Sequence, residues 1–155
     1  MNWIELKQKI YYCDGSLRDI YVLQTSVDDN KKLTEYVNKN YPLKWSNNLN
    51  QTEEDKIDFN IIKLFWEGNL NLFSTVKVLI NKVQVNNHFF APNEIENDVD
   101  PREVNSLDDH KNIISYMSDL SNLLNKPVIL TPENEQGTIL IKVTKNSVEY
   151  SYTPI

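Results

Sequence analysis

One stretch of the chain alternates strictly between acidic and other side chains. Glu94, Glu96, Asp98 and Asp100 occupy every second position. Because strand side chains alternate between two faces, a strand here would place these carboxylates on one face, about 7 Å apart. Pro101 lacks an N–H and favours an extended residue before it, which predicts a strand at the edge of a sheet. Unpaired carboxylates are costly to bury, so we predict that this face meets water or a cationic partner.

The pattern becomes helical a few residues later. Ser106 is placed as an N-cap, and Asp109 follows three residues on, in a capping-box arrangement. Apolar side chains then recur at spacings of three and four, which is typical of one face of an amphipathic helix. This stripe comprises Leu107, His110, Ile113, Ile114, Met117, Leu120 and Leu124. Pro127 prevents the helix from continuing, and a short buried strand is predicted at 128–130.

The remaining segments are shorter and mostly strand-like. Capping residues and periodicity predict helices at 2–9 and 26–40. Residues 57–66 show two phases of alternation, which predicts a bulged strand or a strand buried on both faces. The other predicted strands are 17–23, 43–45, 75–80, 83–90, 138–143 and 147–152.

These elements predict the fold class. Hairpins dominate and strands do not alternate regularly with helices, so we predict an α+β fold. It would contain one antiparallel or mixed sheet of about seven or eight strands, with two or three helices packed on one face. No linker or repeat divides the chain, which predicts a single domain over residues 1–155.

Composition narrows the classes of function. A net charge of −6 and scattered basic residues argue against nucleic-acid binding, which requires a basic face. With only three glycines, a glycine-rich phosphate loop is not predicted, and we expect no cofactor. No apolar run approaches about 18 residues and the N-terminus lacks a signal-peptide pattern, so we expect no membrane partner and a cytoplasmic location.

Candidate chemistry is limited to two histidines and one cysteine. His88 and His110, with carboxylates such as Asp100 or Asp109, are residue types that bind metals, but no ligand spacing such as HExxH accompanies them. We therefore assign no metal ligand and no catalytic residue. His110 lies on the apolar stripe, where a hydrogen-bonded core histidine is expected. Cys13 is expected to be a small buried hydrophobe and not a nucleophile.

Two short segments carry a resemblance. The run Asp98-Val99-Asp100-Pro101-Arg102-Glu103, and Leu130-Thr131-Pro132-Glu133-Asn134 after the helix, are similar to segments of small single-domain bacterial proteins, some of which resemble immunity proteins of toxin systems. The resemblance covers the C-terminal third of the chain and transfers no functional residue. It implies a non-catalytic cytosolic protein that binds and blocks one toxin.

Three hypotheses about function follow. The first is a protein-binding module that neutralises a basic protein, such as a toxin, through its acidic surface, because charge complementarity speeds association. Its predicted partner-binding residues are Glu94, Glu96, Asp98, Asp100, Glu103, Asp108 and Asp109. The second is a regulatory domain that binds a small ligand between sheet and helices. The third is a small enzyme that uses His88 or His110 with a neighbouring carboxylate.

Overall fold

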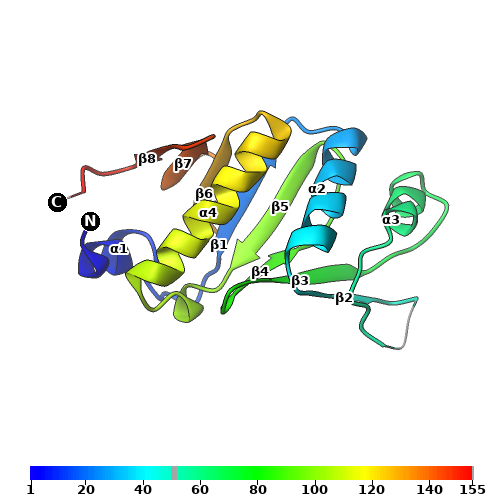
Figure 1. Cartoon of the computed structure of the whole chain (residues 1–155), viewed down its shortest axis with the longest axis horizontal. Helices are drawn as coiled ribbons and strands as arrows, with labels where there is room; N and C mark the ends of the chain where they lie inside the picture. The colour runs from blue at the N-terminus through cyan, green and yellow to red at the C-terminus, as the bar shows by residue number, and fades with distance from the viewer. Residues whose placement is uncertain (50–51, 155) are drawn as a thin grey trace.

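The computed structural model describes residues 1–49 and 52–154 and contains one eight-stranded antiparallel sheet (Figure 1). The strands are β1 (Arg18–Leu23), β2 (Leu43–Asn47), β3 (Ser74–Ile80), β4 (Val83–Asn87), β5 (Glu94–Val99), β6 (Val128–Pro132), β7 (Ile141–Thr144) and β8 (Ser147–Tyr150). The helices are α1 (Trp3–Lys9), α2 (Val27–Asn40), α3 (Phe59–Trp66) and α4 (Leu107–Leu124), with a 3-10 turn, η1, at Pro101–Glu103. The predicted α+β class is confirmed, with four α-helices in the described chain where two or three were expected.

The position of the acidic strand differs from the prediction. The strand order is β2-β3-β4-β5-β1-β6-β7-β8, so β5 is an interior strand and the expected edge position is wrong. The structure tolerates Pro101 because the proline lies beyond the last paired residue, Val99, which faces Arg18 of β1. Its missing N–H therefore removes no hydrogen bond from the sheet.

The two long helices pack against the same face of the sheet. Helices α2 and α4 lie across one face (Figure 1), and α4 buries its predicted apolar stripe there, including Ile113, Met117 and Leu120. Ile95 and Val99 of β5 are buried, in alternation with the acidic positions of the same strand. Because side chains alternate along a strand, the acidic positions point to the opposite side. We call this opposite side the open face.

One predicted strand is a helix. The segment 57–66, expected to be extended, forms α3. Asp58 caps it by accepting a hydrogen bond from the Asn60 backbone N–H (3.0 Å). Phe59, Ile62 and Trp66 recur at spacings of three and four, which fits one helical face as well as the alternation fits a strand. The cap selects the helix where the apolar pattern alone is ambiguous.

The capping predictions for the two long helices are confirmed. Ser26 and Asp29 form a reciprocal capping box at the start of α2. Ser106 accepts a hydrogen bond from the Asp109 backbone N–H, whereas the Asp109 carboxylate accepts from the Asn105 backbone N–H, one residue earlier than in a standard box. Within residues 1–49 and 52–154, no helix is both long and apolar enough to cross a membrane.

Candidate binding surface on the open face

The open face gathers carboxylates from two neighbouring strands. Glu94, Glu96 and Asp98 of β5 lie opposite Leu23, Tyr21 and Asp19 of β1 in the antiparallel register. Asp19 and Asp98 are therefore directly opposed, although like charges in this position repel one another. We call Asp19, Glu94, Glu96 and Asp98 the acidic cluster. Asp19 was missed because its sequence segment reads as an ordinary strand, and only the pairing of β1 with β5 brings it here.

Hydrogen bonds hold the two buried members of this cluster in place. Asp98 is 8% exposed, with its Oδ2 2.5 Å from Nε2 of His88 and its Oδ1 accepting from the Asn86 amide at 2.8 Å. Asp19 is 2% exposed and accepts from the Tyr21 hydroxyl (2.8 Å) and the Asn134 backbone N–H (2.7 Å). These acids are thus fixed in orientation and are not freely solvated, in contrast to the expectation of a wet acidic ribbon.

The loop after β6 passes over part of this face. Besides the bond from Asn134 to Asp19, the Gln136 side-chain amide donates to Glu94 (3.0 Å), and Glu133 accepts from the Leu17 backbone N–H (3.4 Å). Asp19 and Glu94 lie at opposite ends of the β1–β5 pairing, so residues 134–136 run along it. This loop explains why Asp19 is buried although it faces away from the helices.

The carboxylates of the acidic cluster are not balanced by an equal number of basic side chains in the described structure. Burial and the neighbouring carboxylates, Asp19 first among them, raise the pKa of Glu96. Burial also raises the pKa of Asp19, and the hydrogen bond to Asp98 raises the pKa of His88. On β3, Lys77 lies 3.9 Å from Glu53 and so is directed to another acid. Among the described interactions of this cluster, His88 is the nearest group that can carry a positive charge, and the acids outnumber it.

An aromatic pocket of about 360 Å³ adjoins the cluster at His88. Its lining includes Phe65, Phe73, Thr75, His88, Phe89 and Phe90. The His88 ring stacks on the Phe90 ring, with centroids 4.9 Å apart and planes within 12°. Phe73 and Phe90 are 74% and 59% exposed, which is unusual for phenylalanine and places two large apolar surfaces in water.

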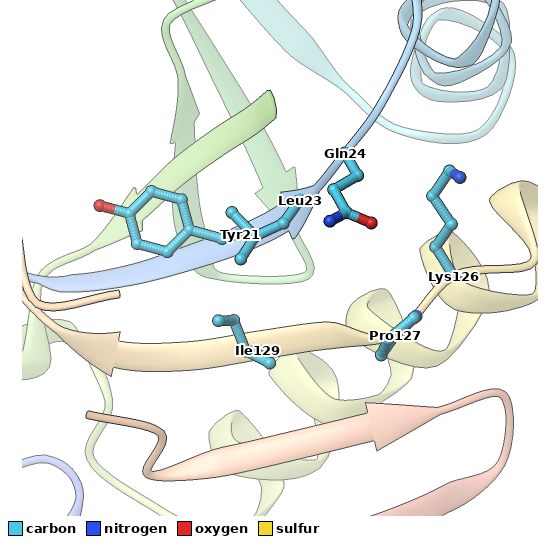
Figure 2. A pocket seen from close by; sticks show the side chains of 6 residues that line it. All are labelled: Tyr21, Leu23, Gln24, Lys126, Pro127 and Ile129. Atoms are coloured by element: carbon cyan, nitrogen blue, oxygen red, sulfur yellow. The ribbon is translucent and has the colours of Figure 1, made fainter. Parts of the chain in front are cut away.

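A second hollow of about 270 Å³ opens where β1 and β6 part (Figure 2). The two strands pair only from Arg18 to Tyr21, so Leu23 and Pro127 are left on either side of a groove. Figure 2 shows Tyr21 and Ile129 on these two strands, with Gln24 and Lys126 near the strand ends. The groove lies between strands and not between sheet and helices, where the small-ligand hypothesis placed its pocket.

The other predicted binding residues do not join the acidic cluster. Asp100 and Glu103 belong to the η1 turn, where the Asp100 carboxylate is bound by Arg102 (2.6 Å between Nη2 and Oδ2). Asp108 lies 3.5 Å from Lys111 on the first turn of α4. Asp109 is 1% exposed in the cap of the same helix. The seven predicted acids lie within residues 94–109 of the sequence but at three separate places in the fold, on β5, at η1 and at the start of α4.

His110 is a core residue, as its place on the apolar stripe predicted. Its Nδ1 lies 2.8 Å from the Tyr11 hydroxyl and its Nε2 lies 2.8 Å from the Tyr150 hydroxyl. Burial lowers its pKa to about 4, so the ring is neutral near pH 7. Both ring nitrogens are engaged by tyrosines, which leaves neither available for another ligand in this arrangement.

The expectation for Cys13 is wrong. The residue is exposed, because it lies in the segment between α1 and β1 and not inside the core. Its thiol contacts the Tyr11 carbonyl at 3.9 Å. In the part of the chain that the structure describes, no group of three or more histidine, cysteine, aspartate or glutamate side chains is arranged to hold a metal ion.

Comparison with known proteins adds no functional assignment. No protein-family model matches the chain, and neither a curated protein nor a solved structure was found to match it.

Proposed function

We propose that this protein is a non-catalytic binding module that binds a basic partner protein through the acidic cluster of its open face. A bacterial toxin of the kind that immunity proteins block would be one such partner, and the cytoplasm is the corresponding location. The proposal keeps three of the seven predicted acids, Glu94, Glu96 and Asp98, and adds Asp19, which the pairing of β1 with β5 brings beside them. Asp100, Glu103, Asp108 and Asp109 are left outside it, because they lie at η1 and at the start of α4 and not on β5.

One observation carries the proposal: the pairing of β1 with β5 places four carboxylates together on one face, with Asp19 directly opposite Asp98. The pKa of Glu96 is raised by burial and by Asp19 and Glu94, which means that its charged form is held at a cost in the isolated chain. A lysine or arginine of a partner placed over Glu96 would reverse that cost. Surfaces with unbalanced charge also steer oppositely charged partners and raise the rate of association.

The exposed aromatic rings beside the cluster support binding to a protein. Phe73 and Phe90 present apolar area next to charged groups, and interface centres are enriched in aromatic residues. An acidic centre with an aromatic margin provides both electrostatic attraction and apolar burial on one side of the molecule.

The test compares two charge-reversed variants in capture experiments from cells that natively express the chain. The first variant carries Glu94→Lys and Glu96→Lys on the open face. The control carries Glu35→Lys and Glu67→Lys, which changes net charge equally at exposed positions on α2 and at the end of α3.

We expect a basic protein to be retained by the wild type and the control and lost by the open-face variant. Association measured with that protein should slow as salt is added for the wild type and depend less on salt for the open-face variant. Equal retention by both variants, or retention that ignores salt, would show that the cluster is not the binding surface.

A further inference from the structure

The aromatic pocket beside His88 has a shape and surroundings that favour one kind of guest. Four phenylalanines contribute to its walls, and the rings of His88 and Phe90 lie nearly parallel, so together they form a flat stacked platform. The outward side of Phe90 is uncovered, since this residue is 59% exposed. Phe73, the most exposed large apolar residue of the described chain, lies in the same lining.

Negative charge lies directly beside this platform. The His88 imidazole is held by Asp98, 2.5 Å from its Nε2, and Glu96 and Asp19 act on the same imidazole through space. Among the described residues that line the pocket, His88 is the only one with a titratable side chain. A guest in the pocket would therefore meet aromatic surface, and the nearest carboxylate of the cluster, Asp98, is the one bound to Nε2 of His88.

We infer that the aromatic pocket receives an arginine side chain of the basic partner, with its guanidinium stacked on Phe90 and directed toward the carboxylates around Asp98. This inference rests on the proposed function and names the chemistry of the partner at the point of contact. A cation over an aromatic face is attracted by the ring electrons. Arginine suits the pocket better than lysine, because its planar guanidinium stacks on rings and forms paired hydrogen bonds with carboxylates.

The remaining lining residues agree with a guest of this kind. The Thr75 hydroxyl lies 3.5 Å from Nδ1 of His88, and Asn71 and Ser74 also line the pocket, so polar groups stand among its aromatic rings. The three-carbon stem of arginine is apolar and would cover Phe73, so that both ends of the side chain find matching surface.

The experiment titrates the isotope-labelled protein with N-acetyl-arginine amide and follows the aromatic and backbone NMR signals. N-acetyl-lysine amide and N-acetyl-citrulline amide serve as comparison probes, since the first changes the shape of the cation and the second removes the charge. We expect saturable shifts at Phe73, His88 and Phe90 that are largest with the arginine probe, smaller with lysine and absent with citrulline.

Two exposed positions provide matched variants. Phe90→Ala should weaken binding of the arginine probe about two- to fivefold, which corresponds to one exposed cation–aromatic contact. Leu79→Ala removes a 40% exposed apolar side chain on β3 that lies outside the pocket lining and should leave the affinity unchanged. Shifts that do not saturate, shifts that are equal for citrulline, or an affinity for the arginine probe that is the same in Phe90→Ala as in the wild type would overturn the inference.

The two proposals fail in different ways. If the arginine probe binds but the Glu94→Lys, Glu96→Lys variant still captures its partner, the pocket is a guanidinium site and the proposed function is wrong. If the capture depends on the acidic cluster but the probe does not bind at Phe90, the proposed function stands and the inference about arginine is wrong.

Discussion

The contact between His88 and Asp98 should stabilise the fold in a pH-dependent manner. Their side chains are 20% and 11% exposed, so solvent screens the pair only in part. A hydrogen bond between charged groups contributes about 1.5–3 kcal/mol. Because Asp98 keeps a second partner in Asn86, we expect a coupling energy near the lower limit, about 1–2 kcal/mol, when His88 is protonated.

The direction of the pH effect follows from the pKa shift. The hydrogen bond from His88 to Asp98 raises the pKa of His88 above its usual value of 6.5. A histidine whose pKa is raised in the folded state contributes its full stabilisation below the unfolded pKa and loses it as the pH rises through the folded pKa. The coupling should therefore be larger at pH 5.5 than at pH 8.5, because a neutral imidazole can still donate an N–H to the carboxylate but no longer attracts it as a cation.

A double-mutant cycle measures this coupling. Urea unfolding is followed for the wild type, His88→Phe, Asp98→Ala and the double variant at both pH values. Phenylalanine retains the stack on Phe90 and removes the ring nitrogens, so the cycle isolates the polar contact. The exposed pair of Asp108 and Lys111 is the control, and its coupling should not change between these pH values. A His88–Asp98 coupling that is equal at both pH values, or larger at pH 8.5, would refute the reasoning.

Three further predictions concern stability. Arg18→Met should lower the unfolding free energy by about 3–5 kcal/mol in urea titrations, because the fully buried guanidinium donates to backbone carbonyls that would lose their partner. Arg102→Met, at an exposed position, should change the unfolding free energy little, and equal effects of the two substitutions would contradict this account. Glu96→Gln should stabilise the protein at pH 8 by roughly 0.3 kcal/mol after solvent screening, because the raised pKa of Glu96 makes its ionisation unfavourable in the folded state. The gain should vanish in thermal melts near pH 4, and a loss of stability at pH 8 would argue against repulsion between the carboxylates. Ser106→Ala should lower the free energy of unfolding by about 1 kcal/mol, because it removes the N-cap of α4. Ser115→Ala, on the exposed side of the same helix, should be neutral in the same melts, and an equal loss of stability would exclude the cap as the cause.

Several local features of the fold were readable from the sequence. Ser26 and Ser106 correctly predicted where α2 and α4 begin, because a serine hydroxyl before a helical pattern accepts a hydrogen bond from a free backbone N–H of the first turn. Strands were predicted at 75–80 and 83–90 and at 138–143 and 147–152, and the structure pairs them as the hairpins β3–β4 and β7–β8. The segment that became α3 was misread because its apolar residues fit two periods.

The chain by itself determined its local elements, the acidic face of β5 and the apolar stripe of α4, because these depend on spacing between near neighbours. Only the tertiary structure decided that β5 lies between β4 and β1. That pairing brought Asp19 and His88 to the acidic strand and left Asp108 and Asp109 elsewhere. Strand order depends on the sum of many weak contacts between residues far apart in the chain, and no spacing within one segment records it.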